Sequence, residues 1–280
     1  MKAPHGAALV LSLGWLAAAC TPLDDPSDIY DDDSAGIGQQ QLPNGEPLDE
    51  TRQTEGDPWE CLQGTRAPLP PREERPETVT YTVSIVDWVT DEAPPGLVIN
   101  VCNRIDPLCA EPLSTVRPPP ERQISFQLPA RIEVFLLLQA TDTVPAAFYF
   151  DGPVVENRLG GLIQLLRFAT VASLTQTFLG TQLDPSMGAL SLRSHDCSGA
   201  IAEGAVFELE PQNGVPFTLI DGAPTPSIVP TDTSGLAGFV NVPPGSFLAR
   251  GMVADDDREF GLANFNVQPA QFSLVEVRSN

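Results

Sequence analysis

The sequence predicts a mainly β protein, with two tandem β-sandwich domains joined by one helix and preceded by an acidic segment without regular structure. Apolar residues alternate with polar ones in many short runs after Thr78, and turns rich in glycine and proline separate these runs, as in β-sandwiches. One later stretch, residues 170–180, has the apolar spacing of a helix instead. The segment 21–58 contains eleven acids and one base, with few apolar residues to form a core.

The first residues have the pattern of an export signal. Lys2 precedes the apolar stretch Ala7–Ala19, whose 13 residues are too few to span a bilayer. The stretch ends in Leu16-Ala17-Ala18-Ala19-Cys20, which resembles the lipobox of bacterial lipoproteins, with Ala17 where leucine is usual. The resemblance implies that residues 1–19 are a lipoprotein signal peptide and that Cys20 carries palmitate-type acyl chains. An ordinary secretory signal beside a cysteine is the alternative.

The lipobox resemblance also implies a location. Acyl chains on Cys20 would hold the protein on a membrane, because each buried methylene contributes about 0.8 kcal/mol. Thr21 stands where an aspartate often retains lipoproteins at the inner membrane, which favours the outer membrane of a Gram-negative cell envelope. The net charge of −22 argues against nucleic acid, whose phosphates need a cationic surface. The expected partners are the membrane, through the anchor, and another envelope protein.

Residues 20–58 are expected to form a disordered acidic tether. They cannot bury enough apolar surface to offset the entropy of ordering, and their like charges extend the chain. Such a tether would space the folded part from the membrane. A calcium site at Asp31-Asp32-Asp33 is the sharper alternative, although the glycine and the final glutamate of a calcium-binding loop are missing.

Four cysteines remain once the lipobox cysteine is assigned to lipid. In an oxidising compartment an even number suggests two disulfides, with three ways to pair them. Cys102 and Cys109 flank a short turn and are the favoured pair, which leaves Cys61 to pair with Cys197. A zinc site is disfavoured, since His195 is the single histidine after the signal segment and no CxxC motif occurs. We therefore expect no metal and no cofactor.

The first sandwich is expected over residues 59–155. Trp59 precedes a cysteine and a leucine, which favours local packing over a disulfide, with ligand stacking as the alternative. From Thr78 to Val89 apolar residues alternate with smaller or polar ones, as in a strand with one buried face. Further strands are expected at residues 97–102, 123–128, 132–139 and 148–150.

The linker between the sandwiches is expected over residues 156–188. It is apolar, but its arginine, glutamines and threonines are wrong for a membrane span. Val171, Leu174 and Phe178 have helical spacing, and Gly180 is suited to end the helix. We expect an amphipathic helix over 170–180, packed between the two sandwiches. A helix that binds a partner is the alternative.

The second sandwich is expected over residues 189–280, and its turns form the most specific pattern of the chain. Asp232 and Gly235 suit a turn, residues 236–242 alternate as a strand, and Pro243-Pro244-Gly245 makes the next turn. The pattern TDxxGxxxFxNVPPGxF resembles the carboxypeptidase regulatory-like family, over the last third of the chain. The resemblance implies an Ig/transthyretin-like β-sandwich without catalysis of its own.

The middle region echoes the C-terminal one. In both, a strand leads to an aspartate turn, a glycine precedes a second strand, and a strand with a phenylalanine leads through a proline turn to another strand. The matching segments are Val83–Asp87 with Leu190–Asp196, Gly96–Val101 with Gly204–Leu209, and Ile124–Phe135 with Leu236–Leu248. Two copies indicate duplicated domains rather than a solenoid. The middle copy lacks the Asp-x-x-Gly turn.

The residue types needed for catalysis do not form a recognisable set. His195 is next to Asp196 and near Ser198, but neighbours in an extended turn point in different directions and do not build a triad. No GxSxG motif and no phosphate-binding glycine loop occurs. We therefore predict no enzyme and no catalytic residue. A deep pocket that holds His195 with a carboxylate distant in sequence would revive the enzyme hypothesis.

Two kinds of function remain. The first is a structural or protein-interaction module, which would use exposed apolar residues or an unpaired strand edge. The second is a surface module that binds carbohydrate through Trp88 or calcium through Asp255, Asp256 and Asp257. A largely exposed Trp88 beside polar residues would favour a sugar. The plainer alternatives are a core position for Trp88 and a solvated hairpin turn for the three aspartates.

Overall fold

Alternating apolar residues form the strands that the sequence predicts. In β1 (Thr78–Asp87), the apolar residues at alternate positions are buried and those between them are partly exposed. The computed structural model describes residues 59–63 and 69–279, which belong to one compact unit. The signal segment, Cys20 and the expected tether lie outside the described residues.

The chain is mainly β, as predicted. The first half of the described residues contains two short 3-10 turns, η2 (Glu60–Gln63) and η3 (Arg72–Glu74), and after β1 the strands β2 (Val98–Asn103), β3 (Ser114–Val116), β4 (Gln123–Pro129), β5 (Val134–Gln139), β6 (Ala146–Tyr149) and β7 (Arg158–Leu165). The second half contains α1 (Phe168–Leu179) and the strands β8 (Gly188–His195), β9 (Ala205–Glu210), β10 (Val215–Ile220), β11 (Ala223–Thr225), β12 (Leu236–Val242), β13 (Gly245–Val253), β14 (Glu259–Val267) and β15 (Phe272–Arg278).

Both halves have the same strand pairing, as the internal similarity predicted. In the first half, β1 lies between antiparallel β4 and parallel β7. In the second half, β8 lies between antiparallel β12 and parallel β15. The strands β2, β5 and β6 pair in the same way as β9, β13 and β14. The strand pairing is therefore repeated in the two halves, and β7 corresponds to β15 as β6 corresponds to β14.

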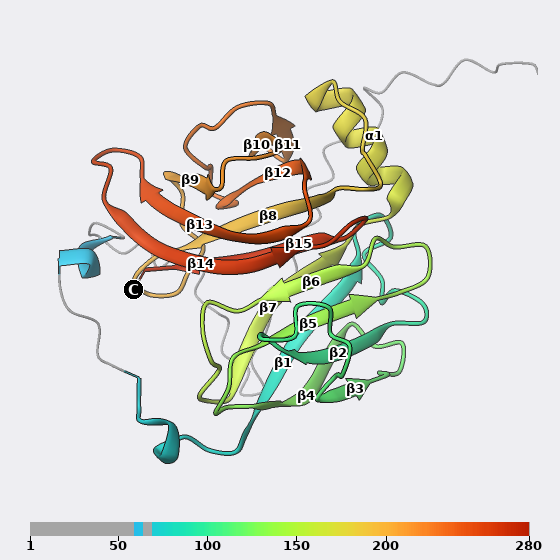
Figure 1. Cartoon of the computed structure of the whole chain (residues 1–280), viewed down its shortest axis with the longest axis vertical. Helices are drawn as coiled ribbons and strands as arrows, with labels where there is room; N and C mark the ends of the chain where they lie inside the picture. The colour runs from blue at the N-terminus through green and yellow to red at the C-terminus, as the bar shows by residue number, and fades with distance from the viewer. Residues whose placement is uncertain (1–58, 64–68, 280) are drawn as a thin grey trace, which may run out of the picture. The chain divides into compact units, whose positions relative to one another are not determined.

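The two sandwiches share one sheet. β15 pairs in parallel with β8 on one side and with β6 of the first half on the other. The result is a nine-stranded sheet in the order β11-β10-β12-β8-β15-β6-β5-β2-β3 (Figure 1). Two three-stranded sheets, β4-β1-β7 and β14-β13-β9, complete the two sandwiches. The last strand of the chain is thus an inner strand of the sheet that both sandwiches use.

The two three-stranded sheets cover opposite faces of the shared sheet. Successive residues of a strand point to opposite faces. On β6, Phe148 belongs to the core with β1 and β4, whereas Tyr149 belongs to the core with β13 and β14. The Phe148 face continues through Leu274 on β15, Ser191 on β8 and Phe217 on β10. We call this continuation, over β15, β8, β12 and β10, the open face, because neither three-stranded sheet covers it.

α1 covers one end of the open face. Val171 and Leu179 pack there against Val240 and Phe272. The helix ends at Gly180, which adopts the left-handed conformation that glycine tolerates best. The predicted linking helix over 170–180 is thus confirmed, with the bounds Phe168–Leu179.

β7 lies inside the segment 156–188, for which the sequence predicts a linker and one helix but no strand. Its register against β1 shifts at Gly160-Gly161, which makes a β-bulge. A Cβ on Gly160 would lie 2.2 Å from the hydroxyl oxygen of Tyr81, so only glycine lets β7 pass this close to β1. The bulge interrupts the alternation of apolar residues, and for this reason the strand was not predicted.

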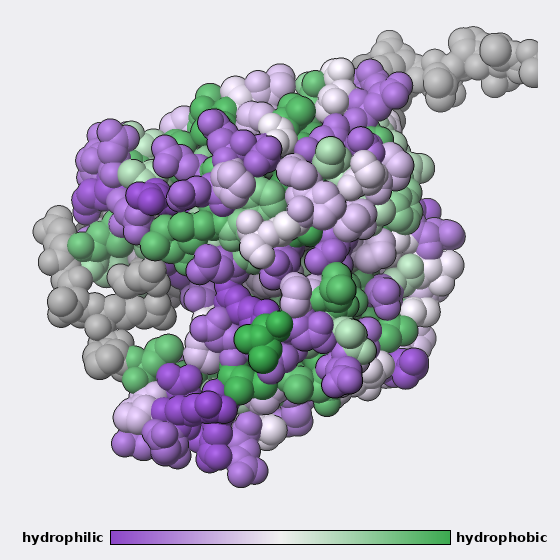
Figure 2. Space-filling view, viewed as in Figure 1, coloured by the Kyte–Doolittle hydropathy of each residue, from purple (hydrophilic) through white to green (hydrophobic). Residues whose placement is uncertain are grey.

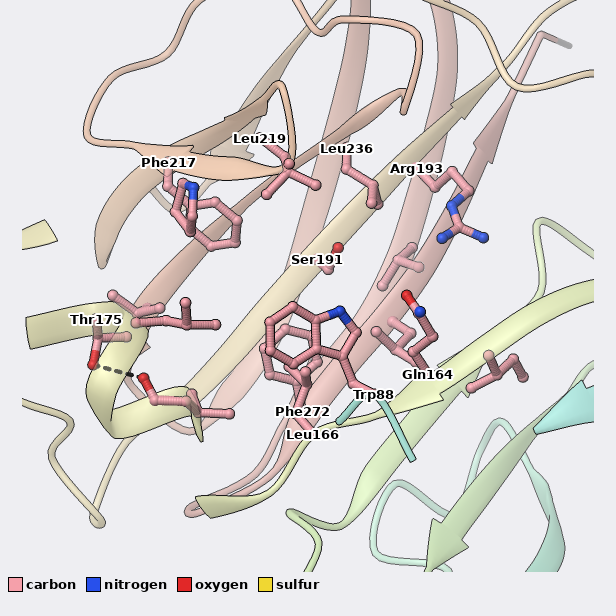
Figure 3. A pocket seen from close by; sticks show the side chains of 18 of the residues that line it. Trp88, Gln164, Leu166, Thr175, Ser191, Arg193, Phe217, Leu219, Leu236 and Phe272 are labelled. Atoms are coloured by element: carbon pink, nitrogen blue, oxygen red, sulfur yellow. Dashed lines mark hydrogen bonds between the residues drawn. The ribbon is translucent and has the colours of Figure 1, made fainter. Parts of the chain in front are cut away.

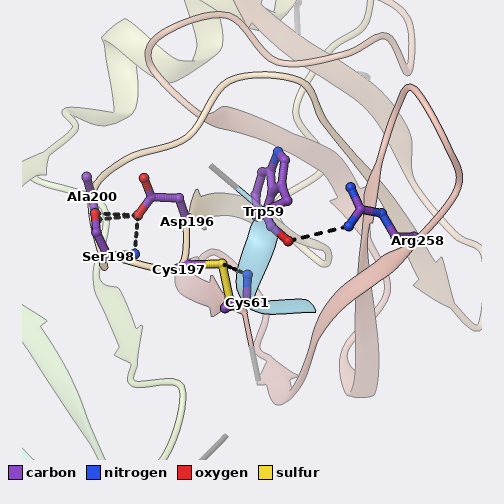
Figure 4. Close-up of a disulfide and its surroundings, with 7 residues drawn as sticks. All are labelled: Trp59, Cys61, Asp196, Cys197, Ser198, Ala200 and Arg258. Atoms are coloured by element: carbon purple, nitrogen blue, oxygen red, sulfur yellow. Dashed lines mark hydrogen bonds between the residues drawn. A yellow bond between two sulfur atoms is a disulfide. The ribbon is translucent and has the colours of Figure 1, made fainter. Parts of the chain in front are cut away.

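Both favoured disulfides form, Cys61–Cys197 and Cys102–Cys109. The first fastens the start of the described residues to the end of β8 (Figure 4). Beside it, Trp59 is only 4% exposed and packs on Phe260 at 4.6 Å between ring centroids. Trp59 is therefore a packing residue, as predicted.

The surface carries exposed apolar side chains in several places. Ile105 and Leu108, in the turn closed by Cys102–Cys109, are among the most exposed. On the face of the molecule seen in Figure 2, apolar residues form separate patches among polar ones. No helix within the described residues is long and apolar enough to cross a membrane.

Candidate binding cleft

A cleft lies over the open face, because the layer above it is incomplete. β7 borders the cleft on one side, α1 at one end, and the hairpin of β10 and β11 on another side (Figure 3). The cleft has a volume of about 200 Å³. Its lining is mostly apolar and includes Leu166, Val171, Leu174, Phe217, Leu236, Phe272 and Leu274. A dry cavity of about 150 Å³ lined by such residues binds benzene, so this cleft has room for an apolar group of a partner.

Trp88 stands at the mouth of the cleft. It follows the last residue of β1, and its side chain lies in front of Phe272 and Leu166 (Figure 3). Trp88 is 41% exposed, so it is neither a core residue nor a freely solvated one. The cleft over which it lies has a mainly apolar lining, and Gln164 is among the few polar residues of that lining.

The turn that carries Trp88 is fixed by a buried aspartate. Asp87 accepts hydrogen bonds from the backbone N–H of Val89 at 2.8 Å and from Arg167 Nε at 2.7 Å. Burial raises the pKa of Asp87, but these bonds and one from the Thr90 N–H lower it more, so its pKa lies below the ordinary value. The charged pair ties the end of β1 to the start of α1, and this holds Trp88 over the cleft.

Arg193 supplies a cation at the polar end of the cleft. It lies on the open face of β8, and no residue of the described part forms a hydrogen bond or an ion pair with its side chain. Its Nε is buried, and desolvation lowers the pKa of the guanidinium, opposed by the charge of Glu276. A partly buried guanidinium without a direct partner is costly, and it is well placed to receive an anionic group of a ligand.

Beyond Arg193, a buried ionic cluster closes the cleft. Glu276 on β15 accepts hydrogen bonds from Arg158 at 2.9 Å and from Arg278 at 3.1 Å, and lies 3.6 Å from His195 Nε2. Burial raises the pKa of Glu276, but His195 and the guanidinium groups of Arg158 and Arg193 lower it more. Its pKa therefore lies below the ordinary value, and the charged carboxylate joins β7 to the shared sheet.

His195 does meet a carboxylate distant in sequence, which was the condition for reviving the enzyme hypothesis. However, His195 is buried behind Glu276 and does not line the cleft. Its Nδ1 lies 3.0 Å from the Gly199 carbonyl oxygen, and Ser198 hydrogen bonds to Asp196 instead. Among the described residues, no hydroxyl or thiol forms a hydrogen bond with His195, as a nucleophile that this histidine activates would.

The other candidate residues lie away from the cleft. Asp255, Asp256 and Asp257 form the turn between β13 and β14, where Asp256 pairs with Arg258. In the part of the chain that the structure describes, no three His, Cys, Asp or Glu residues are grouped to hold a metal ion. The two disulfides do not contribute to the cleft either.

Of the candidate ligand-binding residues named from the sequence, the structure thus brings one, Trp88, to the cleft. Arg193, Ser191 and Leu274 were not singled out, because they come from strands far apart in the chain. Their only common signal is the register of β8 and β15, which places them on one face. That register is not visible before the sheet is known.

Comparison with models of known protein families finds no match, and neither does comparison with curated proteins. Among solved structures, the chain is similar to the TIE protein of Bacillus anthracis, with 13% identity and a TM-score of 0.25 over 72% of this chain and 34% of that one. It is also similar to the shaft pilin SpaA of Lactobacillus rhamnosus GG, with 10% identity and a TM-score of 0.23 over 72% and 98%. The minor pilin GBS52 of Streptococcus agalactiae gives 12% and 0.24 over 72% and 96%. The chain thus spans about a third of the first of these proteins, and no function follows from these distant similarities.

Proposed function

We propose that this protein is a non-catalytic lipoprotein of the outer cell envelope, anchored through Cys20, that binds a partner in the cleft. The observation that carries the proposal is the open face: an apolar part of a sheet, adjoining two sandwich cores, that stays accessible in a folded chain. Apolar clefts with a few polar groups are the usual form of a binding site. A half-exposed tryptophan and a partly buried arginine, Trp88 and Arg193, add the residue types that contribute most at interfaces.

The same lining argues against carbohydrate as the partner. A sugar needs hydrogen-bonding groups around a stacking aromatic ring, and most of the residues that line the cleft are apolar. An apolar group of the partner fits this lining better, because each Å² of apolar surface removed from water contributes about 25 cal/mol. The interaction module is therefore the better supported of the two functions.

Binding in the cleft can be tested with a neutral apolar dye, N-phenyl-1-naphthylamine. We expect saturable binding of one dye per chain and a change in Trp88 fluorescence. Ser191→Phe fills the floor of the cleft and should abolish binding, whereas Thr177→Phe adds the same ring to the exposed side of α1 and should not. Dye binding that survives Ser191→Phe in a chain of unchanged stability would refute the proposal.

The anchor is tested separately by the intact mass of protein purified from membranes. A chain that starts at Cys20 and carries acyl groups supports the envelope lipoprotein. A chain without lipid, or one that starts elsewhere, contradicts the anchor and leaves the cleft to a secreted protein.

A further inference from the structure

β7 has an open edge beside the cleft. It pairs with β1 on one side and is the last strand of its sheet. Among the described residues, no backbone hydrogen bond joins Leu159–Gln164 to another strand on the other side. Leu159 is 65% exposed, and Gly161 and Gln164 are exposed as well. Unpaired N–H and C=O groups along an exposed strand are a template for pairing with another chain.

The internal repeat shows what such an edge can accept. β7 corresponds to β15, since each is parallel to the first strand of its half. The outer edge of β15 is filled by β6, which pairs with it in parallel over four residues from Phe272 to Val275. The edge of β7 is the matching position in the first half, and no strand of the described residues occupies it.

A strand added at the open edge of β7 would lie over the cleft and face its lining. A strand added to β7 would extend the layer β4-β1-β7 over the open face, into the cleft that β7 borders. Alternate side chains of the added strand would then face Leu274 and Ser191 on the floor. Farther along β8, Arg193 has no direct partner among the described residues and would face a neighbouring side chain of that strand.

We propose that β7 and the cleft form one docking site for an extended segment of another protein, which adds to the edge of β7 as a parallel strand. Apolar residues at alternate positions of the segment pack on the open face, and an acidic residue pairs with Arg193. This inference rests on the proposed function, since it names the partner that the cleft binds.

A second copy of this chain is not the expected donor. The strand that corresponds to β6 is β14, and its backbone carbonyls are already engaged. The carbonyl of Asn266 accepts hydrogen bonds from the hydroxyl groups of Tyr149 and Ser273, each at 3.1 Å, and Arg104 donates to the carbonyl of Asn264. These side chains block β14, so head-to-tail pairing of β14 with β7 of another copy is disfavoured.

The test uses the full chain and a capped heptapeptide of alternating valine and threonine with one aspartate. We expect saturable binding, a change in Trp88 fluorescence, and slower hydrogen exchange of the amides of β7. An added strand pairs through the N–H groups of one edge only. We therefore compare one peptide that is N-methylated at its odd-numbered residues with one that is N-methylated at its even-numbered residues. Relative to the unmethylated peptide, one of them should lose about tenfold or more in affinity and the other should lose little.

The role of Arg193 is tested by removing the charge of the peptide's aspartate and, separately, the charge of Arg193. The aspartate peptide should bind about tenfold more tightly than its asparagine analogue, and Arg193→Met should remove this difference. Because Glu276 keeps Arg158 and Arg278 as partners, Arg193→Met should still fold, and its unfolding midpoint is the control.

The peptide and dye experiments distinguish strand addition at β7 from binding in the cleft as such. Equal effects of the two N-methylated peptides, no protection of β7, or no peptide binding would overturn strand addition. If the neutral dye still binds in a manner sensitive to Ser191→Phe, the cleft remains a binding site. If dye and peptide both fail to bind, the proposed function falls with the inference.

Discussion

Glu276 shows how a single buried charge links the two halves of the molecule. It lies on β15, the strand that the sandwiches share, and its partners Arg158 and Arg278 come from β7 and from β15 itself. Asp151 lies within 3.9 Å of Arg158 and 3.3 Å of Arg278, so the cluster contains both signs of charge. Without Glu276, the ion pairs that Arg158 and Arg278 keep among the described residues are the longer ones to Asp151. Breaking a buried pair by removing one partner typically costs about 3–5 kcal/mol.

We therefore expect Glu276→Gln to lower the free energy of unfolding by about 3 kcal/mol at pH 7. The folded pKa of Glu276 lies below its ordinary value of 4.5, so this contribution is complete above that value and is lost as pH falls through the folded pKa. Urea unfolding of the variant and the parent chain, in steps from pH 7 to below pH 4, follows this loss.

Glu259 provides the matched control. It pairs with Arg250 across two exposed side chains, and exposed pairs contribute at most about 1 kcal/mol. Glu259→Gln should change stability little at either pH. A difference between Glu276→Gln and the parent chain that stays constant from pH 7 to below pH 4 would contradict the assignment.

At the scale of elements, β7 depends on one glycine. The bulge at Gly160 brings its Cα close to Tyr81, which is buried and held edge-on between Phe126 and Phe150. The ring cannot move aside without displacing that core. A methyl group here is overpacking, which costs about 1–3 kcal/mol.

Gly160→Ala is expected to destabilise the chain by about 1–3 kcal/mol and to loosen β7. Gly161→Ala is the matched control, because no atom lies within 4 Å of the Cβ it would add. Thermal unfolding measures the first effect, and hydrogen exchange of β7 amides measures the second. Equal midpoints for the two variants would show that the contact with Tyr81 does not fix β7.

The sequence was informative about elements with a regular pattern. The alternation in β1, the glycine that ends α1 and the spacing of Cys102 and Cys109 each depend on neighbouring residues, so local reasoning predicts them. β7 escaped prediction because its bulge breaks the period. The cleft escaped because Arg193 and Leu274 meet only through the pairing of β8 with β15. The lipobox at Cys20 and the carboxypeptidase regulatory-like resemblance stay predictions.

At the scale of the whole molecule, the repeated strand order accounts for two features: the pairing of β6 with β15, which joins the sandwiches, and the open edge of β7. Each half brings a sheet with a free outer strand, and the edge of β15 is satisfied by β6 within the chain. β14 is closed instead by side chains from the first half, among them Tyr149, whose pKa burial raises to about 12 so that its hydroxyl stays a neutral donor. Of the three edges, those of β15, β14 and β7, the edge of β7 is left unpaired by the described residues, and it lies beside an apolar cleft.

Because the two sandwiches share one sheet, we expect them to unfold together. Trp59 packs on β14 of the second sandwich. Trp88 follows β1 of the first sandwich and lies over the open face of the shared sheet, so the two tryptophans report on different parts of the fold. Trp59→Phe and Trp88→Phe variants should give coincident urea transitions, as expected for one cooperative unit. Adding Gly160→Ala, a change in the first sandwich, should shift the midpoint that Trp59 reports as far as the one that Trp88 reports. If only the Trp88 transition moved, the sandwiches would be independent domains, because β15 and its pairing with β6 would then transmit no stability between them.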